Sequence, residues 1–305
     1  MFKDIVSNGE AKSFLQKELF MDRKAGTYLF YGPDRGLLFD FALAFTKGFN
    51  CRNEINDFCD QCEVCKRIDH LTYGDLEVIE SDNGIKIDQI RKMIYDAATT
   101  SYEGGKKVFI LKNIDHMGKE AINSMLKVIE EPKEGIFFIL LSGSLNILST
   151  IKSRSILVPI HRESAEDLGV TQGEYEFFLG NSKEIKKYLN LEEKVNLKTP
   201  ESYEMIGEHI KKYKTLGEFQ DKIKVYKALR DYILNKHYLD KLEGIFFCEE
   251  ILRGGGDRAL VKEIITYAIE LVKSPEKMEE LLILKSIQRQ PISLKNLLIT
   301  FFLSL

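Results

Sequence analysis

The sequence predicts an α/β protein whose N-terminal part holds a parallel sheet and whose C-terminal part is all helical. Residues 1–160 alternate short apolar, β-rich runs with helix-length amphipathic segments, which is the order of a parallel sheet with crossover helices. From about residue 161 onward the pattern is helical, without a convincing strand. The 305 residues are 44% hydrophobic and 30% charged, a globular balance that excludes a disordered chain, a fibre and a disulfide-dense miniprotein.

Five apolar runs in the first 160 residues are expected to form the strands. Several are apolar without interruption, as strands buried on both faces of a parallel sheet are. A helix is expected between Gly118 and Glu131, because its apolar residues recur on one face and Pro132 ends the pattern. Strand, helix and strand in succession imply right-handed crossovers. The expected strands are residues 28–31, 76–79, 107–111, 136–141 and 156–160.

The second half of the chain is expected to be helical throughout. Residues 161–200 are polar, and Glu174 to Leu191 is expected to form one or two helices around Gly180. Longer helices follow, with apolar residues three or four positions apart. The apolar chain end, ISLKNLLITFFLSL, forms either a final helix that closes a domain core or a helix packed on a partner subunit. The longer helices are expected in residues 218–237 and 260–272, and Gly254, Gly255 and Gly256 separate two helices.

Charge and hydropathy restrict the function classes. Lys plus Arg total 44 and Asp plus Glu total 47, so the formal net charge is -3. A chain this close to neutral does not hold nucleic acid by bulk charge, and such a contact needs a local patch or a surface shared by several subunits. No apolar run reaches the roughly 18 residues of a membrane span, and the amphipathic, acid-containing first residues do not resemble a signal peptide. We therefore expect a cytoplasmic protein without a membrane partner.

Four of the five cysteines fall within fifteen residues, in the spacing C-x7-C-x2-C-x2-C. Four thiolates satisfy a tetrahedral zinc ion and leave no open position, so Cys51, Cys59, Cys62 and Cys65 are expected to hold a structural zinc. Two alternatives are four free thiols at chance spacing and a redox Cys-x-x-Cys pair, which explains only two of the sulfurs. Cys248 stands alone and is expected to be a buried core thiol.

A strand, a glycine-containing turn and a helix follow one another around Gly32, in the setting of a phosphate-binding loop G-x-x-x-x-G-K-[ST]. This sequence keeps only the strand, turn and helix order of that motif, with Gly32 and Gly36 in the turn. A helical stretch is expected from Asp40 to Gly48. ATP hydrolysis needs the lysine to neutralise phosphate charge and the hydroxyl to hold magnesium, and apolar side chains supply neither. The alternative is an ordinary strand-to-helix turn. The second glycine, the lysine and the hydroxyl positions are occupied by Leu37, Leu38 and Phe39.

The end of the third expected strand shows the same loss. A hydrolytic site needs one carboxylate there for the metal and another to orient water. Here the apolar run is followed by Lys112 and Asn113, and a lysine at the metal-linked position repels magnesium. Two separate halves of the site are therefore missing, and we expect no productive ATP binding.

Several ordered motifs resemble the bacterial DNA polymerase III clamp-loader family of AAA+ proteins, most closely its delta-prime branch. They are YLFYGP at residues 28–33, the four-cysteine insert, NSMLKVIEEP at residues 123–132 and Ser153-Arg154-Ser155. The last two are similar to the family's N-A-L-L-K-x-L-E-E-P helix and its Ser-Arg-Cys motif. The resemblance covers residues 1 to about 160 well, and the remainder only by layout.

The resemblance implies three domains and a set of partners. Residues 1–160 would form an AAA+ core with a zinc module at about 50–66, residues 161–200 a small helical lid, and residues 201–305 a helical collar used for oligomerisation. The implied partners are the gamma/tau motor and delta subunits of a hetero-pentamer within the DNA polymerase III assembly. The sliding clamp is another, and primer–template DNA would be contacted through the assembled complex. DNA contact would be directed at the phosphate backbone, because loading is independent of sequence.

The resemblance also assigns a role to Arg154. In the family, the arginine of the Ser-Arg-Cys motif reaches into the ATP site of the neighbouring subunit, where a guanidinium offsets charge that develops on the γ-phosphate. Residue type alone allows a plain surface arginine instead. Ser155 replaces the family cysteine and leaves Arg154 in place. Glu130 and Glu131 are expected to cap and orient a helix end, with solvent or a neighbour as partner, rather than to act in catalysis.

These observations predict a non-hydrolysing, delta-prime-like clamp-loader subunit that lends Arg154 to a neighbouring ATPase. One alternative is a hydrolysing gamma/tau-like motor, which needs the missing Lys-Thr pair. Another is a zinc-dependent nucleic-acid-binding module, which would bind DNA tightly by itself with a steep dependence on salt.

Overall fold

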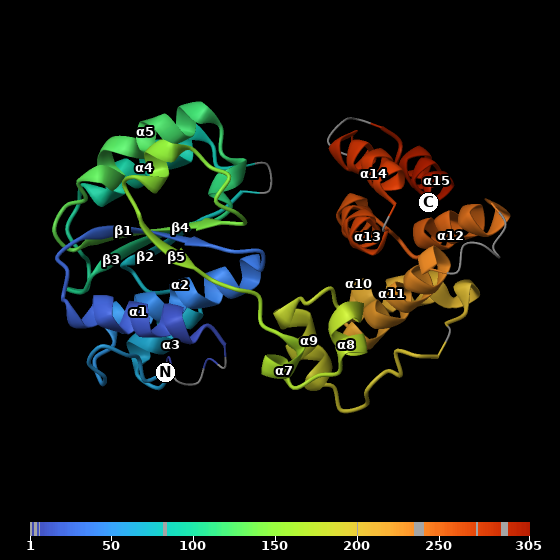
Figure 1. Cartoon of the computed structure of the whole chain (residues 1–305), viewed down its shortest axis with the longest axis horizontal. Coiled ribbons are helices and arrows are strands. Elements are labelled where there is room, and N and C mark those ends of the chain that lie inside the picture. Colours follow the sequence, from blue (N-terminus) through green and yellow to red (C-terminus); the bar gives the residue numbers. More distant parts are fainter. Residues whose placement is uncertain are drawn as a thin grey trace. The chain divides into compact units, whose positions relative to one another are not determined.

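The computed structural model describes residues 2, 5, 7–81, 84–199, 201–234, 241–272, 274–287 and 292–305. Its contacts divide the chain into two compact units, one of residues 1–170 with 180–183 and one of residues 171–179 with 184–305 (Figure 1). The division into core, lid and collar stays a prediction. Among the described residues no helix has the length and apolar character needed to cross a membrane.

The first unit contains a five-stranded sheet in the order β2-β3-β4-β1-β5, with every neighbouring pair parallel. The predicted α/β class is confirmed, and all five predicted runs are strands. Because the strands are parallel, their carboxyl ends lie along one edge, where the loops after β1, β3 and β4 meet. The strands are β1 (Gly26–Tyr31), β2 (Leu76–Ile79), β3 (Lys107–Leu111), β4 (Ile136–Ser142) and β5 (Ile156–Pro159).

Helices cover both faces of this sheet (Figure 1). Strands β3 and β4 are buried along their whole length because both faces are covered. One face packs against α1 (Gly9–Phe20), α2 (Arg35–Asn50) and α3 (Glu63–Asp69), and the other against α4 (Ile87–Ala97) and α5 (Lys119–Glu130). Shorter elements of the unit are η2 (Ile114–His116), α6 (Ser149–Lys152) and α7 (Ala165–Leu168).

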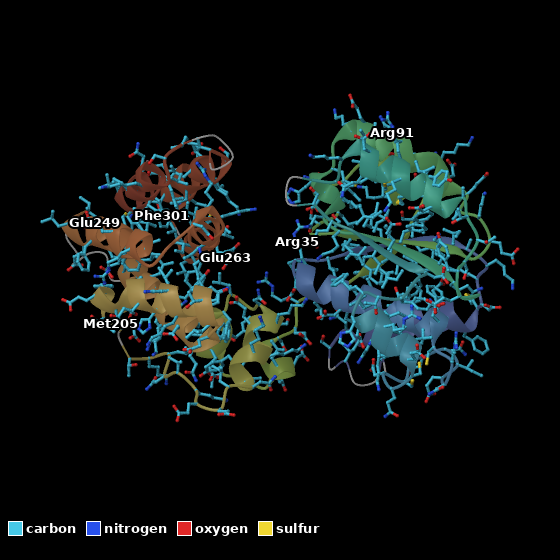
Figure 2. All side chains as sticks on the ribbon, turned by 180° about the vertical axis from the view of Figure 1, so that it is seen from behind. Arg35, Arg91, Met205, Glu249, Glu263 and Phe301 are labelled. Atoms are coloured by element: carbon cyan, nitrogen blue, oxygen red, sulfur yellow. The ribbon has the colours of Figure 1, made fainter. Side chains whose placement is uncertain are left out.

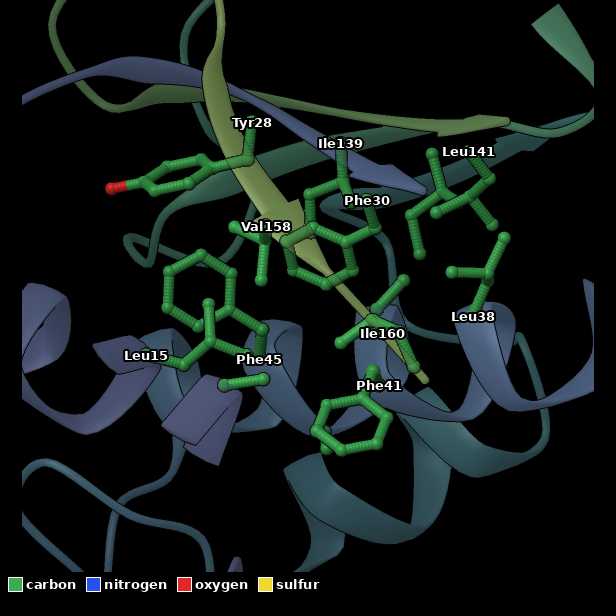
Figure 3. Packing of buried hydrophobic residues seen from close by; sticks show 14 of the residues in the cluster. Leu15, Tyr28, Phe30, Leu38, Phe41, Phe45, Ile139, Leu141, Val158 and Ile160 are labelled. Carbon is green, nitrogen blue, oxygen red and sulfur yellow. The ribbon is translucent and has the colours of Figure 1, made fainter. Parts of the chain in front are cut away.

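Aromatic packing joins α2 to the interior strand β1. The rings of Tyr28 and Phe45 meet edge to face with centroids 4.9 Å apart, and both side chains are fully buried (Figure 3). The Tyr28 hydroxyl donates a hydrogen bond to Glu18 Oε2 at 2.8 Å, so its polar atom is satisfied inside the core. Burial of each large apolar side chain contributes about 1.5–3 kcal/mol, and this packing sets the height of α2 above the sheet.

Helix α2 begins at Arg35 and not near Asp40 as the sequence pattern predicted. The reason is an N-terminal cap, because the Asp34 carboxylate accepts the backbone N–H groups of Gly36 and Leu37. The residues at the lost phosphate-loop positions are therefore the first turns of a helix.

The second unit consists of helices and connecting segments in its described residues, which confirms the helical pattern. Of the predicted segment 218–237, residues Phe219–Leu234 are helical, and residues 235–237 lie outside the described residues. Its helices are α8 (Gln172–Phe177), α9 (Ser182–Leu189, whose first two residues belong to the first unit), η3 (Tyr203–Met205), α10 (Ile206–Leu216), α11 (Phe219–Leu234), α12 (Lys241–Arg253), α13 (Arg258–Leu271), α14 (Pro275–Ile287) and α15 (Leu294–Ser304).

The apolar chain end forms α15 and closes the core of the helical unit. Leu298 and Phe301 are fully buried, and Phe302 packs against Phe247 of α12 with ring centroids 5.0 Å apart. Of the two readings of this segment, the structure favours the helix that closes a domain core. Leu303 remains about half exposed.

Candidate functional site

The four clustered cysteines converge in space. Their Sγ atoms all lie within 4.8 Å of one another, although Cys51 follows the end of α2 and the others flank or begin α3. Tetrahedral zinc, with Zn–S bonds of about 2.3 Å, places its sulfurs about 3.8 Å apart. The thiol cluster, Cys51, Cys59, Cys62 and Cys65, therefore fits a four-thiolate zinc site with little movement.

Backbone hydrogen bonds to sulfur favour the thiolate form of Cys59. The N–H groups of Cys62 and Gln61 donate to Cys59 Sγ at 3.2 and 3.4 Å, and they lower the pKa of Cys59 to about 6. The Cys65 N–H donates to Cys62 Sγ at 3.5 Å. Burial raises the pKa of Cys65, so this thiol needs a bound cation to lose its proton near neutrality.

Ion pairs fasten this insert to the sheet unit. The Lys47 ammonium on α2 pairs with Asp60 and, at 2.9 Å, with Asp69, and it lies 4.6 Å from the centre of the Phe58 ring.

Cys248 lies in the other unit and is buried, and burial raises its pKa to about 12. It thus has the surroundings of an inert core thiol, as its isolation in the sequence suggested.

Residues 32–39, predicted to be a degenerate phosphate loop and here called the degenerate loop, include a carboxylate at the start of α2. Asp34 Oδ1 accepts the N–H groups of Gly36 at 2.9 Å and Leu37 at 3.0 Å. Asp34 Oδ2 accepts the hydroxyl of Ser182 at 3.0 Å. The N-terminal N–H groups of a helix are the donors that a phosphate loop offers to its ligand. In this chain a carboxylate already takes them.

The side chains at the lost glycine and lysine positions point into the core. Leu37 and Leu38 are 3% and 1% exposed. Leu38 points from α2 toward Leu141 of β4 and lies near Ile160 (Figure 3). At the hydroxyl position, the ring of Phe39 lies 4.5 Å from the Lys112 ammonium. These positions therefore serve packing and present no group to a phosphate or a metal.

Arg35 is the first residue of α2 and lies at the edge of the sheet unit (Figure 2). Its guanidinium donates to Asn113 Oδ1 at 2.6 Å and to both carboxylate oxygens of Asp115, at 3.0 and 2.6 Å. A Cβ atom on Gly143, just after β4, would lie 2.6 Å from Arg35 Nη2, so the guanidinium packs against that backbone. Although burial acts in the opposite direction, Arg35 lowers the pKa of Asp115.

Two further residues of the degenerate site have structural partners. Lys112 Nζ lies 2.6 Å from Glu80 Oε2, which follows β2. Gly32 permits a close approach of the chain, because a Cβ atom there would lie 1.9 Å from the Ile160 carbonyl oxygen. The glycine is thus required by the packing of β1 against the chain beyond β5, whatever its relation to a phosphate loop.

Arg154 lies in the turn between α6 and β5, and its side chain is 29% exposed. Its Nε donates to Glu130 Oε2 at 2.8 Å, and its Nη1 donates to the Thr150 carbonyl at 3.2 Å. Sequence reasoning selected both Arg154 and Glu130 but not their pairing. It also missed Asp34, for which the position just before a helix was a usable capping signal. No sequence signal indicated the pairing of Arg35 with Asp115.

Comparison with known families gives a match over just over half of the chain. A family model described as "DNA polymerase III, delta subunit" matches residues 7–164. The matched segment contains the thiol cluster, the degenerate loop and Arg154.

Curated relatives and a solved structure agree with that match. DNA polymerase III subunit delta' of Bacillus subtilis is 33% identical over 147 residues, which are 48% of this chain and 45% of that protein. DNA polymerase III subunit tau of the same species is 29% identical over 144 residues, 46% of this chain and 25% of that protein. The matches thus span about half or less of these relatives. The crystal structure of a DNA polymerase III gamma subunit-related protein from Thermotoga maritima has a similar fold, with TM-score 0.56, 17% identity, and coverage of 96% of this chain and 97% of that one.

Proposed function

This chain belongs to the family described as DNA polymerase III, delta subunit, and on that premise we propose that it is a non-hydrolysing, delta-prime-like subunit of a clamp loader. The family resemblance found in the sequence is thereby confirmed. In the proposed role the chain assembles with gamma/tau-like motor subunits and a delta subunit in a hetero-pentamer. The complex places a sliding clamp on primer–template DNA, and ATP is hydrolysed at a neighbouring subunit.

The inability to hydrolyse ATP is supported by the occupants of the degenerate loop. Leu38, at the lysine position, is buried in the core, Asp34 accepts the helix N–H donors, and Arg35 pairs with Asp115 from the loop after β3. A triphosphate would have to displace a carboxylate of its own charge sign and break an ion pair. It would gain no lysine and no hydroxyl ligand in return.

The proposed contribution to catalysis is Arg154, which would reach the ATP of the neighbouring subunit. The observation that carries this proposal is that Arg154 stands in the Ser-Arg-Ser turn inside the family-matched segment with its guanidinium partly exposed. A guanidinium near a transferring γ-phosphoryl group is worth roughly 10³- to 10⁵-fold in rate in related NTPases.

We also propose a structural zinc in the thiol cluster. The four sulfurs fit a tetrahedral ion, and when bound the zinc would cross-link the end of α2 to α3. Cys51, Cys59, Cys62 and Cys65 would hold it, and Lys47 would continue to join the insert to α2 by its ion pairs.

Tau and gamma relatives make a hydrolysing motor subunit the second candidate. The feature that separates the two is position 38, where a motor carries the phosphate-loop lysine and this chain carries a buried leucine. The motor candidate therefore predicts ATP turnover by the isolated chain.

The test measures ATP hydrolysis by the chain alone and by the complex reconstituted with its motor and delta subunits. We expect no turnover by the isolated chain and a loss of hydrolysis in the complex when it carries Arg154→Ala. The lost part of the hydrolysis rate should equal the part that comes from the one ATP site that Arg154 reaches. The matched control is Arg23→Ala, which removes another carboxylate-paired arginine of the same unit. Turnover by the isolated chain, or a complex unaffected by Arg154→Ala, contradicts the proposal.

A further inference from the structure

We propose that Glu130 is a positioning residue for Arg154. It would hold the guanidinium by its Nε edge so that the Nη edge can be presented to the phosphate of a neighbouring subunit. This inference rests on the proposed role of Arg154 and adds a residue to it. It starts from the hydrogen bond between Arg154 Nε and Glu130 Oε2 at 2.8 Å.

The contacts of the guanidinium are divided between its two edges. Nε is taken by Glu130, and Nη1 donates to the Thr150 carbonyl at 3.2 Å and lies 3.5 Å from the Ser153 hydroxyl. Among the described residues, Nη2 has no hydrogen-bond partner. Since a guanidinium has five N–H donors in a fixed plane, protons on Nη2 are free for an incoming anion while Nε remains bound.

Glu130 and Arg154 both lie next to residues of one hydrophobic core. Glu130 is the last residue of α5 and follows Ile129, which is 1% exposed and whose carbonyl accepts the Thr27 hydroxyl at 2.8 Å. Arg154 N–H donates to the carbonyl of Ile151 at 3.1 Å, and Ile151 is fully buried. Ile129 and Ile151 belong to the same buried cluster. The packing of this cluster thus fixes the geometry of the Arg154–Glu130 pair within the chain itself, before a neighbouring subunit binds.

Helix electrostatics argue against a purely structural role for Glu130. A carboxylate in the last turn of a helix meets the negative end of the helix dipole, which disfavours it. Arg154 offsets that charge, whereas the neighbouring Glu131 is exposed and has no ion pair among the described residues. The chain therefore places an acid where helix stability does not require one, and only this acid meets the arginine.

Restriction of a long side chain explains how Glu130 would assist the reaction. A free arginine on a surface turn samples many rotamers and loses that freedom when it meets a phosphate. A carboxylate that already holds Nε reduces the loss, which is the benefit of a preorganised group in a site where charge develops. The benefit is realised in the transition state, so the effect belongs in kcat of the complex and not in KM for ATP.

The experiment uses the reconstituted complex with Glu130→Gln, its matched control Glu131→Gln, and each change combined with Arg154→Ala. We expect Glu130→Gln to lower the part of kcat that depends on Arg154 by about three- to tenfold with KM unchanged, and Glu131→Gln to leave both constants as they were. In the Arg154→Ala background Glu130→Gln should cause no further loss, because the contact that it weakens is already absent. Thermal unfolding of the free chain checks that the variants fold equally well.

Each outcome decides the matter. The inference is wrong if kcat is unchanged or raised by Glu130→Gln, if Glu131→Gln lowers it equally, or if the losses add in the double variant. If Arg154→Ala slows the complex while Glu130→Gln does not, the arginine role survives and the positioning role fails. If Arg154→Ala has no effect, both fail together.

Discussion

Arg35 Nη2 lies 2.6 Å from Asp115 Oδ2, so a side chain of the degenerate loop forms an ion pair with a residue beyond the end of β3. Asn113 also accepts a hydrogen bond from Arg35, at 2.6 Å. The two loops that would grip a nucleotide and its metal in a hydrolytic site are here tied to each other. At the carboxyl edge of the sheet, the positive charge of Arg35 and the negative charge of Asp115 are thus paired with each other.

The Arg35–Asp115 pair predicts a pH dependence of stability. Burial alone would raise the pKa of Asp115, but hydrogen bonding and charge from Arg35 lower it below its usual value. A folded-state pKa below the unfolded value stabilises the fold at higher pH, and the contribution disappears as pH falls through the folded pKa. The difference in free energy of unfolding between wild type and Asp115→Asn should therefore be fully present at pH 7, begin to decline as pH falls to about 4, and be lost only below the folded-state pKa of Asp115.

Urea unfolding at several pH values between 7 and 3 measures that difference. The control is Asp88→Asn, whose partner Arg91 and own side chain are largely exposed, so its difference should be small at every pH. A difference for Asp115→Asn that does not change with pH would show that the pair contributes nothing through charge.

Leu38→Lys, which restores the missing phosphate-loop lysine, should destabilise the protein and not produce an ATPase. Leu38 is 1% exposed and packs in the cluster with Leu141 and Ile160. Placing an ammonium there costs about 3 kcal/mol or more, while Leu38→Met, which keeps volume and apolar character, costs less than about 1.5 kcal/mol. Denaturant unfolding gives both values. Unchanged stability with measurable ATP turnover in Leu38→Lys would mean that the loop is not locked as described.

Replacing both Cys59 and Cys62 with Ser should abolish metal binding. Wild type is expected to carry about one zinc per chain, because four thiolates complete one tetrahedral site. The double variant should lose it, and protease should cut the insert between Cys51 and Cys65 more readily than the sheet. Elemental analysis supplies the stoichiometry. The control Cys248→Ser lies in the helical unit outside the thiol cluster and should keep the zinc, and retention in the double variant would refute the four-thiolate assignment.

Ser155→Cys should stabilise the chain. The Ser155 hydroxyl oxygen is buried and has no hydrogen-bond partner among the described residues. An unsatisfied buried hydroxyl costs about 1–3 kcal/mol, and a thiol of similar shape is a weaker hydrogen-bonding group that tolerates an apolar site. We expect about 1 kcal/mol of added stability in chemical unfolding and no change in hydrolysis by the complex. A loss of stability would indicate that the hydroxyl is satisfied by water.

The strands of the sheet unit could be predicted because each is indicated by a short, continuous apolar run in the sequence. The runs at β3 and β4 are apolar at nearly every position, and such runs between helix-length segments leave few alternatives to a parallel sheet. The start of α2 was misplaced because the phosphate-loop pattern assigned residues 32–39 to a turn, whereas the Asp34 cap begins the helix at Arg35.

By itself, the sequence determined the α/β class, the strand positions, the gathering of four thiols and the absence of a lysine and hydroxyl at the phosphate loop. Those features depend on residue type and short spacing. Only the tertiary structure decided that Arg35 meets Asp115, that Asp34 meets Ser182 and that Arg154 meets Glu130. These partners are between 24 and 148 positions apart in the chain, and contacts at such separation follow from the crossover connections and the packing of the core, which no local pattern encodes.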